Sequence, residues 1–381
     1  MELNEIVNIV SGYAFPSSDM QAEGVPILKI TNILENGELD LENTIKYSKS
    51  IPEKLRKFLL RDKDVLVCMT GATIGKVARK QKVKQDFLIN QRVAIIRAKE
   101  KLLEDFVYYL LSLPAFRKYV EIVGYGAAQP NISAKSIGKF RFLSVGNFYK
   151  CQSIGTILSA YDSLIENNTK RIRLLEKMAE NLYKEWFVRF RFPGYEKAEM
   201  ENGLPKGWKI KRYEDELNVK YGKGLPTDRL TDKGYPVFGS NGQIGYYTSY
   251  MYEQPQILIS CRGASSGVVN ISLPMSFVTN NSLVCEIGDK TESVFEYLKY
   301  YFLNTNLVQY QTGSAQPQIT INNIVKLKML VPLKEVQNKF AAKVMVFDKE
   351  MQNLAKQNTL LARRRDLLLP RLMSGKLEVK P

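Results

Sequence analysis

A dense run of positive charge lies between residues 76 and 101 of this 381-residue chain. Lysine and arginine occur there nine times against two acidic residues. The first part of the run holds Lys76, Arg79, Lys80, Lys82 and Lys84. Because these residues alternate with apolar ones, we expect much of the charge on one side of a strand hairpin. Such a surface neutralises phosphates and gives affinity for nucleic acid without sequence information.

Side chains that read bases are of a different kind. Arginine matches the edge of guanine bidentately, and asparagine and glutamine match that of adenine. Several such residues stand in segments that we expect to form loops, and we take them as candidate DNA contacts: Asn90, Gln91, Arg92, Gln129, Arg262, Asn280, Asn281 and Gln316.

Enzymatic chemistry finds little support in the sequence. Histidine is absent, which removes the commonest general base and metal ligand. The segment 71–77 is too short for a phosphate-binding loop, and Val77 stands where a serine or threonine would hold magnesium. No Asn-Pro-Pro-Tyr or Asp-Pro-Pro-Tyr occurs, and the acidic residues form no tight cluster for two-metal chemistry. We expect no catalytic residue, no metal site and no cofactor in this chain.

The composition fits a basic globular protein that binds a polyanion. The chain has 55 Lys and Arg against 39 Asp and Glu, a formal charge of +16. It lacks an apolar run long enough to span a bilayer and a signal peptide, so we expect a soluble cytoplasmic protein without a membrane partner. The four cysteines are far apart, which favours reduced, packed thiols.

The chain contains an internal duplication. Matching segments follow one another in the same order: 64–80 and 256–271, 87–97 and 276–287, 104–113 and 293–304, 124–133 and 312–320. The first pair is a strand, a glycine turn and a second strand, and the last pair shares Ala-Gln-Pro-x-Ile. Repetition at a fixed order indicates two copies of one structural unit.

The duplication divides the candidate DNA contacts into two groups. Asn90 and Asn280 occupy matched positions, so we favour a scaffold role for them, the capping of a turn. Arg92 and Arg262 are not shared and are the better candidates for specificity. Gln129 and Gln316 either touch DNA or satisfy backbone groups of their own turns; the sequence leaves both interpretations open.

Each copy ends in a long amphipathic helix. Apolar residues recur at alternating spacings of four and three from Ile154 to Leu182, and the same pattern recurs from Phe340 to Leu368 at a constant offset. This spacing predicts the seam of a coiled coil; two helices packed on separate cores are the alternative.

Polar residues interrupt both seams, at Asn168 and at Asn358. If the helices pair in antiparallel orientation about an approximate twofold axis, Asn168 faces Asn358 and Ile172 faces Leu354. A buried asparagine pair fixes register and orientation at a cost in stability. The alternative is that each asparagine faces solvent or a partner subunit.

The sequence therefore predicts an α+β fold with two duplicated mixed α/β domains and two long antiparallel coiled-coil helices that separate them. The expected boundaries are 1–150 for the first domain, 151–187 for its helix, 188–207 for a linker, 208–333 for the second domain, 334–372 for its helix and 373–381 for the tail. Pro370 is expected to stop the second helix near residue 369.

The ordered motifs resemble those of type I restriction-modification specificity subunits. The resemblance rests on the glycine hairpins, the strands with Asn90 and Asn280 and the two Gln-Pro-x-Ile loops, together with the segments 203–208, 331–337 and 371–377. It covers nearly the whole chain. One departure is the segment 145–151, which lacks the Pro and Glu found before the second helix.

The resemblance implies a non-catalytic subunit with two target recognition domains, each reading half of a split site in double-stranded DNA. It further implies that the helices act as a ruler and dock two methyltransferase subunits, which restriction (nuclease-translocase) subunits join. S-adenosylmethionine, ATP and magnesium would belong to those partners. A helix about 50 Å long would set half-site centres about one to one and a half DNA turns apart.

Two other functions stay open at this point. A self-sufficient DNA-modifying enzyme is opposed by the missing motifs, and a scaffold unrelated to nucleic acid is opposed by the duplication together with the charge.

Overall fold

The computed structural model describes residues 1–35, 37–80, 82, 84–124, 130–143, 146–313 and 316–379. The chain forms two compact units. Unit 1 consists of Met1–Asn168 and Lys356–Pro381, and unit 2 of Thr169–Ala355. No helix in the described part of the chain is both long and apolar enough to cross a membrane.

Unit 1 is built on a four-stranded antiparallel sheet with the order β1-β8-β5-β6. Its strands are β1 (Val7–Ser11), β5 (Val65–Cys68), β6 (Val77–Arg79) and β8 (Val93–Ala98). The predicted glycine hairpin is β5, a 3-10 turn at Gly71–Thr73, and β6. Gly71 and Gly75 both have positive φ, which explains why glycine stands there.

A second sheet covers one face of the first, in the order β2-β4-β3-β7. Its strands are β2 (Met20–Gln21), β3 (Val25–Leu28), β4 (Ile45–Tyr47) and β7 (Leu88–Ile89). Alternation along β5 divides the core: Leu66 and Cys68 pack toward the second sheet, and Val65 and Val67 toward the helices. Those helices are α1 (Glu104–Leu111), α2 (Pro114–Gly124), α3 (Ala134–Gly138) and part of α4 (Phe148–Tyr183).

Unit 2 repeats this architecture. Its main sheet has the order β12-β18-β15-β16, and the covering sheet has the order β14-β13-β17. The main strands are β12 (Leu217–Tyr221), β15 (Ile257–Ser260), β16 (Val269–Ile271) and β18 (Ser282–Ile287). The covering strands are β13 (Tyr235–Gly239), β14 (Gly242–Tyr247) and β17 (Phe277–Val278).

The remaining elements of unit 2 lie beside its long helices. Two short antiparallel pairs are β9 (Met200–Glu201) with β10 (Leu204–Pro205) and β11 (Lys209–Arg212) with β19 (Lys328–Val331). The helices are α5 (Tyr213–Glu216), α6 (Phe295–Leu303), α7 (Ile321–Ile324) and part of α8 (Lys334–Met373).

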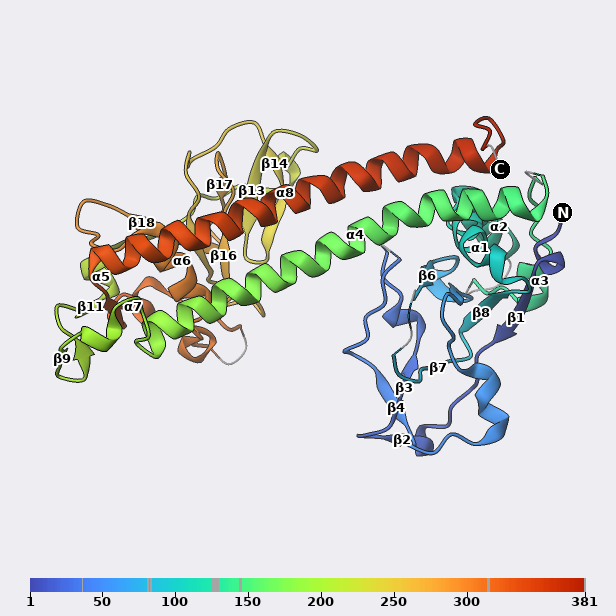
Figure 1. Cartoon of the computed structure of the whole chain (residues 1–381), viewed down its shortest axis with the longest axis horizontal. Coiled ribbons are helices and arrows are strands. Elements are labelled where there is room, and N and C mark those ends of the chain that lie inside the picture. Colours follow the sequence, from blue (N-terminus) through green and yellow to red (C-terminus); the bar gives the residue numbers. More distant parts are fainter. Residues whose placement is uncertain are drawn as a thin grey trace. The chain divides into compact units, whose positions relative to one another are not determined.

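Each unit contains one segment of α4 and one of α8, which run side by side (Figure 1). In unit 1, Asp162 pairs with Arg365 at 2.5 Å and Asn168 contacts Gln357 at 3.4 Å. In unit 2, Arg171 pairs with Glu350 at 2.7 Å, while Tyr183 meets Phe340. Advance along α4 corresponds to retreat along α8 in both units, so the segments are antiparallel.

Burial along these helices follows the predicted seam. None of the seam positions from Ile154 to Leu182 or from Phe340 to Leu368 is exposed. Asn168 is buried, and its amide donates to Oε1 of Gln357, the neighbour of Asn358. A direct Asn168–Asn358 contact stays a prediction.

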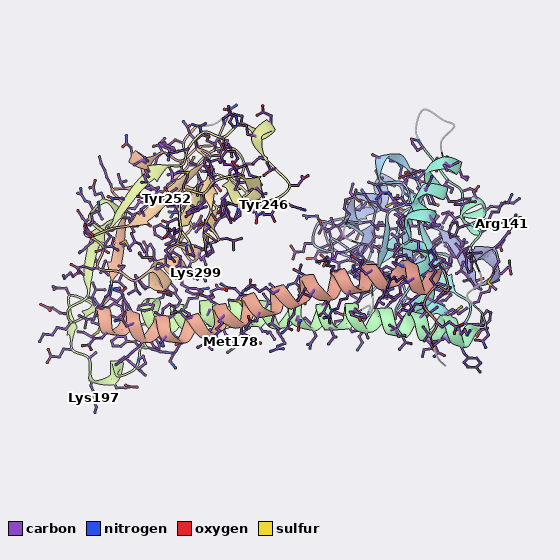
Figure 2. All side chains as sticks on the ribbon, turned by 90° about the horizontal axis from the view of Figure 1, so that it is seen from above. Arg141, Met178, Lys197, Tyr246, Tyr252 and Lys299 are labelled. Carbon is purple, nitrogen blue, oxygen red and sulfur yellow. The ribbon has the colours of Figure 1, made fainter. Side chains whose placement is uncertain are left out.

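An aspartate on each long helix fastens it to its domain. In unit 1, the hydroxyl of Tyr109 donates to Asp162 at 2.5 Å. In unit 2, Tyr300 donates to Asp348 at 3.1 Å, and Lys299, which Figure 2 labels, pairs with the same carboxylate at 2.7 Å. The two aspartates occupy equivalent positions of the helical repeat, so the fastening is duplicated with the domains.

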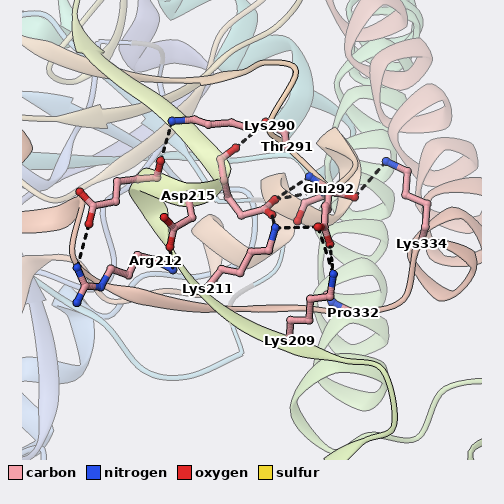
Figure 3. A network of polar contacts seen from close by, with 12 residues as sticks. Lys209, Lys211, Arg212, Asp215, Lys290, Thr291, Glu292, Pro332 and Lys334 are labelled. Carbon is pink, nitrogen blue, oxygen red and sulfur yellow. Dashed lines mark hydrogen bonds and ion pairs between the residues drawn. The ribbon is translucent and has the colours of Figure 1, made fainter.

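A polar network joins the segments 211–216 and 292–294 to the start of α8 (Figure 3). The side chain of Glu216 is fully buried and pairs with Lys211 at 2.7 Å. It also accepts hydrogen bonds from the backbone N–H groups of Glu292 and Ser293. Buried Gln337 completes the junction by accepting from the N–H of Val294 and donating to a carbonyl before α8. These bonds satisfy groups that would be costly to bury alone.

The first long helix begins differently, as the departure at 145–151 suggested. Asn147 caps α4, because its Oδ1 accepts from the backbone N–H of Lys150 at 3.0 Å. Cys151, which takes the place of Gln337 in the helical repeat, is buried in the core of unit 1 instead of bridging backbone groups.

Pro370 does not end the second helix, so that expectation was wrong. Helix α8 continues to Met373 with Pro370 inside it. A proline removes one helical hydrogen bond, and its ring crowds the carbonyl four residues earlier, so the last turn needs other contacts to hold it. Leu372 and Met373 are buried in the core of unit 1, and their burial stabilises the additional turn.

The prediction of reduced, packed thiols is confirmed: Cys68, Cys151, Cys261 and Cys285 are all free and buried. Burial raises the pKa of the Cys68 thiol to about 11, so this thiol is uncharged at neutral pH and acts as a small apolar side chain.

The helix register can be tested by a double-mutant cycle. Asn168→Leu or Asn358→Leu alone should lower the free energy of unfolding by about 1–2 kcal/mol, because each leaves amide groups in the seam without a matched partner. The double variant should recover the loss. Denaturant unfolding of the full chain measures this, with Asn167→Leu on the exposed face of α4 as control. Additive losses would show that the two asparagines do not form a pair.

Candidate nucleic-acid interface

Loops from distant parts of unit 2 meet at one end of its main sheet. We call the segments 222–223, 261–263, 279–281 and 316–318 the second loop edge. Backbone hydrogen bonds join them: Cys261 N–H donates to Asn281 O at 2.9 Å, and Asn280 N–H donates to Lys223 O at 3.1 Å. Gly263 N–H donates to Pro317 O at 3.0 Å. Four candidates from the sequence, Arg262, Asn280, Asn281 and Gln316, are therefore brought together.

Unit 1 has the same construction, formed by the segments 12–13, 69–71, 90–92 and 130–131, which we call the first loop edge. Met69 N–H donates to Arg92 O, and Gln91 N–H donates to Tyr13 O, both at 2.9 Å. Gly71 N–H donates to a carbonyl in 130–131, also at 2.9 Å. Asn90, Gln91 and Arg92 thus share one edge. Gln129 lies outside the described residues.

Glycine at one position of each loop edge is required by close packing. A Cβ on Gly12 would lie 2.2 Å from the carbonyl oxygen of Asn90, and one on Gly222 would lie 2.3 Å from that of Thr279. Both glycines lie just after the first strand of the main sheet of their unit, β1 or β12, and are followed by proline four residues later. This matched Gly-x-x-x-Pro spacing is a signal that the sequence analysis missed.

The match between Asn90 and Asn280 was wrong by one position. The N–H of Gln91 donates to Tyr13 O as the N–H of Asn280 donates to Lys223 O, so Asn280 corresponds to Gln91, and Asn90 corresponds to Thr279. Spacing alone could not show this shift.

The two asparagines also differ in what their side chains do. Oδ1 of Asn90 accepts from the backbone N–H of Arg92 at 3.3 Å, as expected for the capping of a turn. Asn280 contributes its backbone to the second loop edge, since its carbonyl lies 3.5 Å from the Cys261 thiol. A base contact by its side chain stays a prediction.

Exposure separates the candidate readers from the scaffold. Gln91 and Arg92 are exposed on the first loop edge, and Arg262 and Gln316 on the second. Asn281 is half-buried. Bidentate groups held by fixed backbones suit recognition of base edges.

Arg79 is not a surface residue, and we remove it from the candidate phosphate contacts. Its side chain is 3% exposed and pairs with Asp105 at 2.6 Å. The guanidinium also lies 4.1 Å from the ring centre of Tyr108. Alternation along β6 does place Arg79 on one side of the hairpin, but that side is covered by α1. The sequence pattern could not indicate which face the helix covers.

The four candidate lysines of the basic run differ in the exposure of their side chains. Lys76 pairs with Glu35 at 2.8 Å, and its side chain is 14% exposed. Lys80 is half-buried, whereas Lys82 and Lys84 are exposed in the connection between β6 and β7. Of the four candidate lysines, Lys82 and Lys84 are therefore the most accessible to a phosphate.

Comparison with known proteins points to one family. A family model described as "Type I restriction modification DNA specificity domain" matches residues 1–177 and 205–362. A specificity subunit of the type I restriction enzyme MjaIX from Methanocaldococcus jannaschii is 26% identical, over 84% of this chain and 78% of the relative. The EcoprrI specificity subunit of Escherichia coli is 25% identical, over 91% of this chain and 87% of the relative.

A solved structure shares the fold. The crystal structure of the type I restriction-modification system S subunit from M. genitalium aligns with a TM-score of 0.60 at 17% identity. The alignment covers 98% of this chain and 95% of the other.

Two sets of variants should separate the buried arginine from the exposed lysines. Arg79→Ala should lower the free energy of unfolding by about 3 kcal/mol, because Asp105 loses its buried partner, and should leave the salt dependence of DNA binding unchanged. Alanine at Lys80, Lys82 and Lys84 should weaken binding to all sequences and reduce the salt slope by about 1 per lysine. Salt titrations and thermal unfolding measure both. A changed base preference with an unchanged slope would refute the phosphate assignment.

Proposed function

The chain belongs to the family of type I restriction-modification DNA specificity domains, and on that premise we propose that it reads a bipartite, asymmetric DNA site. Each domain reads one half. The observation that carries this proposal is the duplicated loop edge, in which the same backbone bonds hold exposed side chains at the same end of each sheet.

Different side chains on a shared scaffold support two unlike half-sites. The first loop edge presents Gln91 and Arg92, whereas the second has Asn280 and Asn281 at those two places and Arg262 on the neighbouring loop. Because arginine and amide groups prefer different bases, the two edges would select different sequences. A palindromic site would require matched readers.

The excess of positive charge supplies the affinity in this proposal. Exposed lysines such as Lys82 and Lys84 neutralise phosphates, and the loop edges then test the bases. The division of labour is that phosphate contacts position the protein while the loops discriminate.

We assign the long helices to spacing and docking. In this proposal they form a coiled-coil ruler, and the repeat offers equivalent surfaces to two methyltransferase subunits. Leu174 and Leu360, at equivalent positions of the helical repeat, are 61% and 56% exposed and are candidates for such matched contacts. Restriction (nuclease-translocase) subunits join that assembly, and S-adenosylmethionine, ATP and magnesium bind to the partners rather than to this chain.

Co-purification from the native cell tests this proposal against the alternatives. A methyltransferase present in two copies per chain supports a specificity subunit. If the purified chain alone methylates or cuts DNA, it is an enzyme in its own right, and if it binds no DNA it is a scaffold.

The recognised site should be two unrelated short sequences separated by a fixed run of unread base pairs. Methylation mapping of the host genome measures this directly. Exchange of residues 222–330 for the same region of a relative should change one half of the site and leave the other half intact. A continuous motif or a palindrome would contradict the proposal.

A further inference from the structure

A hairpin of unit 2 presents its tip beside the second loop edge. Strands β13 and β14 pair in antiparallel register from Tyr235 opposite Tyr247 to Gly239 opposite Gly242 (Figure 1). The turn therefore consists of Ser240 and Asn241, and Gly242 follows with a φ of +82°. A left-handed glycine after a two-residue turn is typical of a tight hairpin with a bulge.

Two buried hydroxyls fix this tip to the end of the main sheet. Ser260 donates to the carbonyl of Ser240, and Ser282 donates to the carbonyl of Gly239 at 3.1 Å. Both serines are fully buried and lie opposite each other in the register of β15 and β18. A hydroxyl is costly to bury unless it forms a hydrogen bond, so the pair locks the tip in one position.

Unit 1 lacks this lock. The same places in its main sheet hold Cys68 and Val93, which also lie opposite each other. Its connection between β3 and β4, residues 29–44, is longer. The buried side chain of Asn32 holds this connection, because it accepts from the N–H of Lys29 and donates to the carbonyls of Asp40 and Asn43. The Cys68 thiol approaches Ile30 O only at 3.9 Å. The two copies therefore place unlike elements beside the same kind of loop edge.

The chemistry of the hairpin tip suits the reading of bases. Asn241 and Gln243 are exposed, and their amides match the edge of adenine. Ile244 and Tyr246 beside them are 43% and 38% exposed, and Figure 2 labels Tyr246 on this hairpin. The major groove of B-DNA is wide enough for a two-stranded ribbon.

We propose that Asn241 and Gln243 at the tip of the β13–β14 hairpin read bases of the second half-site, and that Ser260 and Ser282 are positioning residues which hold that tip. The proposal rests on the proposed function and deepens it. It assigns specificity in unit 2 to a hairpin, in addition to the loops that bear Arg262 and Asn281.

The test uses the full chain assembled with its methyltransferase partners. Replacing Asn241 and Gln243 by alanine should reduce the preference for cognate over altered second half-sites roughly tenfold to a hundredfold. Discrimination in the first half-site, affinity for unrelated DNA and the salt slope should not change. Gln254→Ala is a matched control, because Gln254 is exposed in the same unit but precedes β15 at the other end of that strand.

The positioning role has its own variants. Ser260→Ala with Ser282→Ala should relax preference at the same base positions as the tip variant, with less effect elsewhere. Ser276→Ala is the control, since Ser276 is a buried serine that donates to Leu273 O within its own loop. Thermal unfolding identifies variants that fail to fold; the exposed tip variant does not depend on that outcome.

The failures of the two proposals are distinguishable. If the tip variant keeps the wild-type preference at every position while the exchange of 222–330 still changes one half-site, the hairpin proposal is wrong and the proposed function stands. A uniform loss of affinity with a flatter salt dependence would make the tip a phosphate contact and also overturn the proposal. If the wild-type assembly shows no sequence preference, the proposed function itself fails.

Discussion

Both units depend on segments of the two long helices to complete their cores, and in each unit a tyrosine of the domain binds a carboxylate of one of these helices. Asp162 receives Tyr109 in unit 1, and Asp348 receives Tyr300 in unit 2. A sheet with apolar residues on both faces needs a layer packed on each face. The helices within each domain do not form the whole layer on the helix side. Segments of α4 and α8 complete both cores. Each aspartate sits in that cover with a cation beside it, which offsets the cost of burying its charge.

This shared requirement explains what the duplication has kept. The glycines, the fastening aspartates and the apolar seam all serve the packing of the core. A change in any of them would expose apolar surface of a sheet or leave a buried charge without its partner. The loop edges are held together by hydrogen bonds between backbone atoms, which do not depend on the identity of the side chain. Apart from Gly12, Gly222 and the capping Asn90, their side chains are consequently free to differ at little cost to the fold, and so is the connection after β3 or β13. Variation is therefore concentrated where bases would be read.

Much of this architecture could be predicted from the sequence because it depends on periodicity and order. The seam spacing indicated the buried faces of both helices, and the glycine pairs indicated the hairpins. The site was harder. Arg79 was misassigned because alternation along a strand shows which residues share a face but not which face is covered by another element. Helix α1 covers the face that bears Arg79. The Gly12 and Gly222 loops were missed because they lie farther apart in the sequence than the other matched segments, a consequence of the unequal connections that follow them. The lock formed by Ser260 and Ser282 depends on register, which neither composition nor spacing reveals.

The positive side chains of the protein fall into two groups: those that neutralise buried carboxylates in the fold, and those that are exposed and available to bind DNA. Arg79 and Arg365 neutralise Asp162 inside unit 1, and Lys211 neutralises Glu216 inside unit 2. If one of these cations left its partner, a buried carboxylate would remain in an apolar environment without a counter-charge. Exposed side chains such as Lys82 and Lys84 respond to salt and to phosphate at lower cost. In the proposed function, a net charge of +16 therefore attracts DNA at a distance, while a smaller group of exposed side chains makes the contacts. In that proposal, the loop edges, which carry few charges of their own, discriminate among sequences.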